Sequence, residues 1–241
     1  LMQGNEVIGS FRLTTKTPRT SDEFGLCIKE LLDMTKLQED DIEAVIISSV
    51  VPKIMYSLTS AIVKFLHKDP IIVGPGIKTG ISIRTDNPRE VGADRIVDIS
   101  MAYHTYHKSC IIVDFGTATT FDYISGDGVF KYTVIAPGLG IVANALTSQT
   151  AKLPEIEIQK PESILNGNTI TGMQAGVIYG YIGSVEYIIK QMKKELKLKD
   201  CLVIATGGLG KVIAKETKEI DLFDPDVAYK GMRILYDLNK K

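Results

Sequence analysis

Apolar and polar positions along the chain follow two periods, which predict strands alternating with helices. Alternating apolar residues predict a strand over residues 6–15, after a turn at Gly4-Asn5. Continuous apolar runs predict buried strands at residues 42–50, 71–73, 110–114 and 202–205. Helical spacing predicts helices at residues 21–34, 52–67, 88–106, 139–148 and 169–196. This order indicates a layered α/β fold with parallel strands.

The second half of the chain contains a hairpin that echoes the start of the first half. Strands are predicted at residues 120–124 and 129–135, and the turn before the second resembles the one at Gly4-Asn5. If the halves are duplicates, the first half should also contain a strand that ends in an acid like Asp114. The counterpart of Asp114 would lie about eight residues before Leu1. We therefore expect two domains, residues 1–108 and 109–241, the first lacking its leading strand and phosphate loop.

Charge and composition exclude several classes of function. The chain carries 28 basic and 29 acidic residues, so it offers no strong field for sequence-independent binding of nucleic acid. Its apolar runs are far shorter than the roughly 20 residues that span a bilayer. The first residues lack the pattern of a signal peptide, and Cys27, Cys110 and Cys201 are too scattered for a disulfide framework. A cytoplasmic location is expected.

Two glycine-containing turns follow buried strands and are candidates for binding a nucleotide. Residues 114–119 (DFGTAT) combine an acid at a strand end with a glycine and hydroxyl groups, which can surround a phosphate and hold a cation. The alternative is a hairpin in which Asp114 and the threonines satisfy turn hydrogen bonds. Gly207-Gly208 could let a base or ribose lie against bare backbone, although glycine turns of this kind are common.

A third candidate is the segment Gly92-Ala93-Asp94-Arg95, which lies near a predicted helix start. A carboxylate can take a proton there while the neighbouring guanidinium pairs with an anionic group of a substrate. The alternative is an ordinary pair of charges on a helix surface.

Taken together, these features are typical of the actin, hexokinase and Hsp70 superfamily, and the chain resembles one of its families, the type III pantothenate kinases. The most specific match is residues 87–95 (NPREVGADR). Other matching segments are residues 11–15, 22–23, 47–52, 74–76, 78–80, 114–120, 135–138, 151–154, 167–169 and 206–208. The resemblance implies two duplicated ribonuclease-H-like (actin-like ATPase) domains, each a mixed sheet flanked by helices.

The resemblance also implies an activity, transfer of the γ-phosphate of ATP to the hydroxyl of pantothenate, which is the first step of coenzyme A biosynthesis. By position, Asp94 would accept the proton of that hydroxyl. Gly92, Ala93 and Arg95 would line the substrate site, with Arg95 facing the carboxylate of pantothenate. Thr169 would reach the substrate from the partner subunit of a homodimer.

For the nucleotide, the resemblance implies that Asp114 binds a monovalent cation, K⁺ or NH₄⁺, and that Mg²⁺ accompanies ATP. Gly116 and Thr117 would contact the phosphates of ATP, and Gly207 and Gly208 would complete its site. Positioning and charge neutralisation do most of the work in phosphoryl transfer, which agrees with such a set of residues.

The chain departs from the family pattern at two places, one before the motif at residues 87–95 and one on the predicted strand at residues 129–135. Thr85 stands where the family usually has a tyrosine, and Tyr132-Thr133 replaces a Gly-Gly pair. These departures motivate an alternative hypothesis, a non-catalytic paralogue that binds pantothenate or nucleotide as a regulatory or accessory protein. A sugar or acetate kinase of the same superfamily is a third hypothesis.

Overall fold

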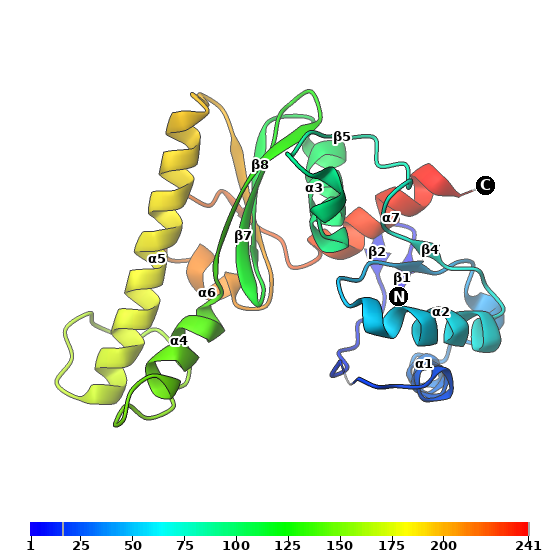
Figure 1. Ribbon diagram of the computed structural model, residues 1–241, viewed down its shortest axis with the longest axis horizontal. Coiled ribbons are helices and arrows are strands. Elements are labelled where there is room, and N and C mark those ends of the chain that lie inside the picture. The colour runs from blue at the N-terminus through cyan, green and yellow to red at the C-terminus, as the bar shows by residue number, and fades with distance from the viewer. Residues whose placement is uncertain (16, 241) are drawn as a thin grey trace. The chain divides into compact units, whose positions relative to one another are not determined.

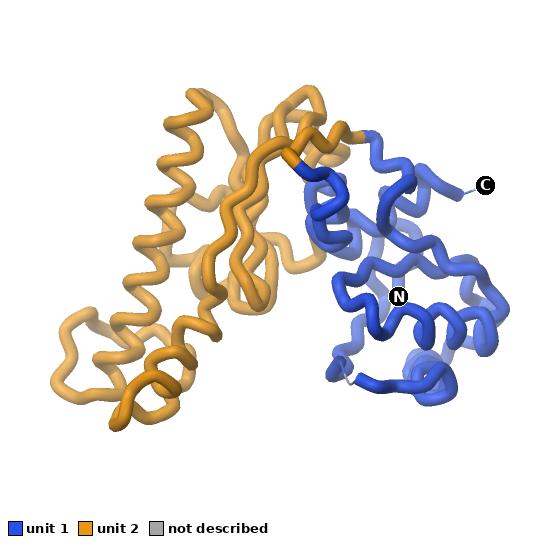
Figure 2. The backbone as a smooth tube through the Cα atoms, viewed as in Figure 1, with its two compact units in different colours: residues 1–80, 87–101, 228–241 blue, residues 81–86, 102–227 orange. Residues whose placement is uncertain are grey.

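The computed structural model describes residues 1–15 and 17–240, which form two compact units (Figure 2). Unit 1 comprises residues 1–80, 87–101 and 228–241, and unit 2 comprises residues 81–86 and 102–227. The final helix, α7 (Val227–Asn239), thus groups almost entirely with segments from the first hundred residues. The expected division into domains 1–108 and 109–241 stays a prediction.

Unit 1 contains two small sheets and a pair of packed helices (Figure 1). Its elements other than α7 are β1 (Met2–Gln3), β2 (Glu6–Val7), α1 (Ser21–Met34), the 3-10 turn η1 (Glu39–Asp41), β3 (Ile46–Ile47), α2 (Pro52–Leu66), β4 (Ile71–Ile72) and η2 (Pro88–Glu90). β1 and β2 are antiparallel, and β3 and β4 are parallel. A buried cluster joins α1, β3 and α2 through Leu32, Ile47, Ile62 and Leu66.

Unit 2 is built on one six-stranded mixed sheet with the order β10-β9-β6-β7-β8-β5. The strands are β5 (Ser82–Ile83), β6 (Cys110–Phe115), β7 (Ala118–Ile124), β8 (Val129–Pro137), β9 (Leu202–Thr206) and β10 (Leu222–Phe223). β6, β7 and β8 form an antiparallel meander, whereas β9 runs parallel to β6. The helices are α4 (Leu139–Ser148), α5 (Thr169–Glu195) and the short α6 (Gly210–Ala214), and α3 (Ala93–Tyr106) begins in unit 1 and ends in unit 2.

The core of unit 2 lies between this sheet and α5, which runs beside it in Figure 1. Residues of α5 that are buried there include Val177, Ile178, Tyr181, Val185 and Ile189. They recur at spacings of one, three and four, which places them on one face of the helix. β6 contributes fully buried side chains on both faces of the sheet, as expected of a central strand.

Several predicted elements are confirmed and two are wrong in extent. The helix at 139–148 has its predicted ends, and α5 begins at the predicted residue. For α1, either Thr20 or Ser21 could cap the helix by sequence, and the structure has Thr20 as the cap, in a capping box with Glu23. The strand predicted over residues 6–15 is confined to Glu6–Val7, where it pairs with β1, and Ile8, Phe11 and Leu13 beyond it are 39–49% exposed. The strand predicted over 42–50 is confined to Ile46–Ile47, where it pairs with β4.

Candidate active site

The candidate phosphate loop lies at the end of the central strand of unit 2. Asp114 is opposite Thr206 in the parallel pairing of β6 with β9, so both strands end at the same edge of the sheet. In the antiparallel pairing of β6 with β7, Asp114 is opposite Thr120. Gly116 and Thr117 form the exposed turn between these strands. In sheets of this kind, ligands bind beyond the carboxyl ends of parallel strands.

Gly207 fits against the acid of this loop because it has no side chain. Its φ is +94°, a conformation that L residues rarely adopt. A Cβ atom at this position would lie 2.6 Å from Oδ1 of Asp114 and 2.6 Å from the carbonyl oxygen of Phe115. The structure therefore brings Asp114 and Gly207 together, with Gly208 exposed at the next position.

Gly138 closes the other side of the loop. Its amide donates a hydrogen bond to the carbonyl oxygen of Thr117 at 3.1 Å. A Cβ atom on Gly138 would lie 2.1 Å from that oxygen and 2.6 Å from the carbonyl oxygen of Gly116. By sequence, Pro137-Gly138 is only part of the segment 135–138 that matches the family. Its support of the loop follows from the tertiary structure.

A buried tyrosine that sequence reasoning missed, Tyr181 of α5, contacts both strands next to the loop. Its hydroxyl oxygen is 2.5 Å from Oγ1 of Thr119 and donates to the carbonyl oxygen of Pro137 at 3.1 Å. Its ring lies beside that of Phe115, with 6.3 Å between centroids. Burial raises the pKa of the Tyr181 phenol, although the hydrogen bond with Thr119 acts in the opposite direction. In sequence, Tyr181 had no signal beyond that of a core residue.

The acid and arginine predicted for the substrate lie in unit 1, at the start of α3. Oδ1 of Asp94 accepts a hydrogen bond from the backbone amide of Arg95 at 2.8 Å. A Cβ atom on Gly92 would lie 2.5 Å from the same oxygen, so this glycine leaves room for the carboxylate. Asp94 is exposed and Ala93 is buried. Because the carboxylate is near a helix N-terminus and open to solvent, a ligand can reach it.

Thr169 is the first residue of α5 and is exposed. It precedes Tyr181 by twelve residues on the same helix, which corresponds to about 18 Å along the axis. Since Tyr181 contacts the strands beside the phosphate loop, Thr169 lies well away from the loop of its own unit. The structure therefore does not bring Thr169 together with Asp114, Gly116 and Thr117.

The two departures from the family pattern lie in the sheet of unit 2 and beside it. Oγ1 of Thr85 is buried and has no hydrogen-bond partner among the described residues. Tyr132 lies on β8 and is 44% exposed. Neither residue contributes a side chain to the contacts that form the phosphate loop.

The donor atoms around the loop suit a cation that shares its ligands with a nucleotide. In the part of the chain that the structure describes, no cluster of three or more His, Cys, Asp or Glu side chains could hold a metal ion. The edge of the loop offers the Asp114 carboxylate beside the carbonyl oxygen of Phe115, and oxygen donors of this kind are the ones that hard cations prefer. The residues present therefore fit a cation that accompanies ATP.

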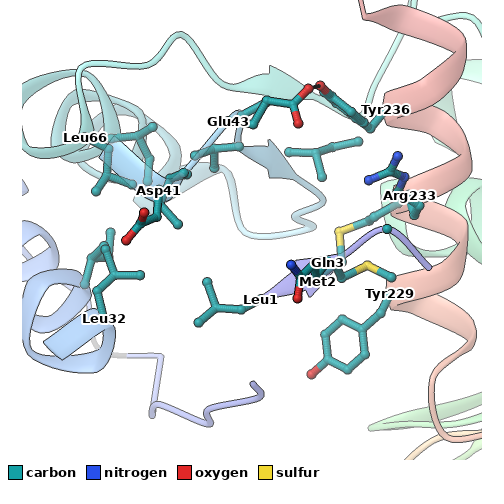
Figure 3. A pocket seen from close by; sticks show the side chains of 18 residues that line it. Leu1, Met2, Gln3, Leu32, Asp41, Glu43, Leu66, Tyr229, Arg233 and Tyr236 are labelled. Atoms are coloured by element: carbon teal, nitrogen blue, oxygen red, sulfur yellow. Dashed lines mark hydrogen bonds between the residues drawn. The ribbon is translucent and has the colours of Figure 1, made fainter. Parts of the chain in front are cut away.

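A cavity of about 520 Å³ lies in unit 1 and is not lined by any predicted site residue (Figure 3). Apolar side chains such as Leu1, Leu32 and Leu66 line much of it, and Tyr236 donates a hydrogen bond to Glu43 among the residues around it. It is bordered by β1 and β3, each of which pairs with one other strand among the described residues.

Comparison with solved structures identifies the fold. The chain matches a conserved putative Baf family transcriptional activator from Campylobacter jejuni, with a TM-score of 0.53, 17% identity and coverage of 86% of this chain and 87% of that one. It also matches a putative N-acetylglucosamine kinase from Porphyromonas gingivalis, with a TM-score of 0.50, 13% identity and coverage of 100% and 95%. The predicted α/β fold of actin-like ATPases is confirmed.

Comparison of sequences identifies the family. The family described as type III pantothenate kinase matches residues 1–191. A type III pantothenate kinase of Agathobacter rectalis is 50% identical over 236 residues, covering 98% of this chain and 91% of that protein. One from Bifidobacterium longum is 48% identical over 240 residues, covering 100% and 94%. The chain belongs to the type III pantothenate kinase family, as its motifs predicted. Within residues 1–15 and 17–240, none of the helices has the length and hydropathy needed to cross a membrane.

Proposed function

We propose that this protein is an ATP-dependent kinase that phosphorylates pantothenate to 4'-phosphopantothenate, the first step of coenzyme A biosynthesis. The observation that carries the proposal is membership of the type III pantothenate kinase family over nearly the whole chain. The loop between β6 and β7 supports it, since an acid, two glycines and a threonine meet there at the edge of the sheet. Transfer to an alcohol needs a base, an anchor for the acceptor and charge neutralisation on the phosphates.

For ATP, we assign the phosphate contacts to Gly116 and Thr117, and the remainder of the site to Gly207 and Gly208. The exposure of Gly116, Thr117 and Gly208 supports this role, and phosphate oxygens can approach the backbone closely at glycines, which have no side chain. Mg²⁺ would enter with ATP and neutralise charge on its phosphates. Asp114 would hold a monovalent cation, K⁺ or NH₄⁺, at the same edge.

For pantothenate, we assign the proton acceptor to Asp94 and the partner of the substrate carboxylate to Arg95. The hydrogen bond from the amide of Arg95 orients one oxygen of Asp94, which leaves the other to accept the proton of the attacking hydroxyl. Gly92 supports this arrangement by leaving space beside the carboxylate. A guanidinium suits a carboxylate because it can bind both oxygens.

A homodimer is proposed through the exposed face of α5. Gly172, Gly176, Gly180 and Gly183 lie on one stripe of this helix, and a Cβ atom on any of them would meet nothing within 4 Å. Thr169 precedes Gly172 by three residues and lies on the same stripe. Packing of this stripe against a second copy would bring Thr169 towards the partner, which supports its role at the partner's substrate.

The test is a coupled assay of ADP release by the protein expressed from its complete gene. With Mg²⁺ and K⁺ present, we expect ADP release that depends on pantothenate and not on N-acetylglucosamine or acetate. Release with a sugar or acetate instead would replace the substrate assignment. Binding of pantothenate or nucleotide without turnover would favour the non-catalytic paralogue, and replacement of K⁺ by Na⁺ tests the monovalent cation.

A further inference from the structure

One buried side chain of α5 connects β7 with the end of β8, beside the loop at residues 114–119. Tyr181 is 7% exposed, and its hydroxyl lies between Oγ1 of Thr119 on β7 and the carbonyl oxygen of Pro137 at the end of β8. Its ring lies beside Phe115, which directly follows the acid of the loop. A residue outside the loop thus contacts it at Phe115 and Thr119 and also contacts Pro137 on the neighbouring strand.

The direction of these hydrogen bonds follows from the donor inventory. A phenol has one proton, and the carbonyl oxygen of Pro137 can only accept. Tyr181 therefore donates to Pro137, and its oxygen accepts the proton of the Thr119 hydroxyl. A phenol is protonated at neutral pH, and burial raises the pKa of Tyr181 further above its ordinary value. Two consecutive hydrogen bonds therefore link β7 to Tyr181 of α5 and Tyr181 to β8.

Gly138, the residue after Pro137, connects the end of β8 to the loop. The amide of Gly138 donates to the carbonyl oxygen of Thr117 at 3.1 Å, and there is no space for a Cβ atom between these segments. A shift of Pro137 must therefore move the carbonyl group of Thr117. Tightly packed segments transmit small displacements because they contain few voids.

We infer that Tyr181 is a positioning residue for the nucleotide: through Thr119 and Pro137 it holds the turn at Gly116-Thr117 in the conformation that receives the phosphates of ATP. This inference rests on the proposed function of that turn. Tyr181 itself touches no substrate, so its effect is on the affinity for ATP rather than on the chemistry at pantothenate.

The test replaces the phenol with a ring that lacks only the hydroxyl, Tyr181→Phe. We expect the KM for ATP to rise about tenfold, the ratio expected when a buried hydrogen-bonded pair is lost. The KM for pantothenate stays within twofold of the wild type. Partial unfolding lowers kcat but leaves KM unchanged, so this split separates positioning from a structural role. Equal increases in both KM values, or an unchanged KM for ATP, would refute the inference.

The chain offers a matched control two residues away. Tyr179 also lies on α5 and donates to a proline carbonyl oxygen, that of Pro161, at 3.3 Å. Tyr179→Phe removes the same kind of hydrogen bond at a place that does not contact the loop. Its KM for ATP should stay within twofold of the wild type, and a rise equal to that of Tyr181→Phe would count against the inference.

A second pair of variants keeps the inference testable if Tyr181→Phe does not fold. Thr119→Val removes the hydroxyl with little change in volume, and Thr119→Ser retains it. We expect the KM for ATP to be about threefold higher in Thr119→Val, because the phenol of Tyr181 loses one of its two hydrogen-bond partners. In Thr119→Ser, which keeps this hydrogen bond, the KM for ATP should stay within 1.5-fold of the wild type. Equal KM values for ATP in these two variants would refute the inference.

Calorimetric binding of the non-hydrolysable analogue AMP-PNP separates this inference from the proposed function. If the wild type binds the analogue but does not phosphorylate pantothenate, the proposed substrate is wrong, while Tyr181→Phe must still weaken binding about tenfold. If the wild type does not bind the analogue, the turn at Gly116-Thr117 is no nucleotide site and the inference is wrong as well.

Discussion

Gly138→Ala tests the packing that closes the phosphate loop, and Gly140→Ala is its matched control. The backbone of Gly138 has φ −68° and ψ 157°, which alanine adopts without strain, so the change is purely steric. The new Cβ atom would lie 2.1 Å from the carbonyl oxygen of Thr117. To reach ordinary contact at 3.4 Å, one of the two segments must move by about 1.3 Å.

The expected cost of that movement has two parts. Overpacking in a tight site costs about 1–3 kcal/mol, and loss of the hydrogen bond from Gly138 to Thr117 adds about 1 kcal/mol. We therefore expect the free energy of unfolding to fall by about 2–4 kcal/mol. The KM for ATP should rise as well, because the displaced carbonyl group belongs to the proposed phosphate turn.

The assay is urea denaturation together with ATP-dependent kinetics of the same samples. At Gly140, in the first turn of α4, a Cβ atom would meet nothing within 4 Å. Gly140→Ala should therefore stabilise the protein by about 0.5–1 kcal/mol through helix propensity. If Gly138→Ala leaves both the free energy of unfolding and the KM for ATP unchanged, the close contact at Thr117 does not exist in solution.

Three further predictions concern catalysis, assembly and pH. Asp94→Asn should lower kcat by about 10²–10⁴-fold and leave the circular dichroism spectrum unchanged. Asp69→Asn, at an exposed aspartate, is the control with normal kcat, and near-normal turnover of Asp94→Asn would show that Asp94 is not the base. Gly180→Glu should weaken the dimer by about 2–5 kcal/mol, as measured by light scattering, because it places an unpaired charge on the glycine stripe of α5. Gly180→Ala should not weaken the dimer, and a Gly180→Glu dimer of normal affinity would contradict the proposed interface. Burial raises the pKa of the Cys110 thiol from 9 to about 12 and that of Cys201 to about 11, so above pH 9 the unfolded chain loses protons that the folded chain keeps. In reducing buffer, the free energy of unfolding should fall by about 1 kcal/mol per thiol between pH 9 and 10. Cys110→Val should reduce this slope, and an unchanged slope would show that this thiol is not buried.

The sequence by itself determined the family, the fold class and the main elements of unit 2. The helices at 139–148 and 169–195 are readable because their apolar residues follow helical spacing, and β6 is readable because it is apolar throughout. The motif at residues 87–95 is specific enough to indicate the family without coordinates. A motif of adjacent residues can be recognised from sequence because residues that are neighbours along the chain are also close together in the folded protein.

Only the tertiary structure decided which strands find partners and which distant residues support the loop. The alternation over residues 6–15 predicts a strand, yet pairing ends at Val7, because a strand needs a neighbour that its own sequence does not specify. Tyr181 lies 62 residues from Thr119 and has the spacing of a core residue, so its hydrogen bonds cannot be inferred before the sheet and α5 are packed. The close approach of Gly138 to Thr117 likewise depends on how β8 returns to the end of β6, which is a property of the fold rather than of any local pattern.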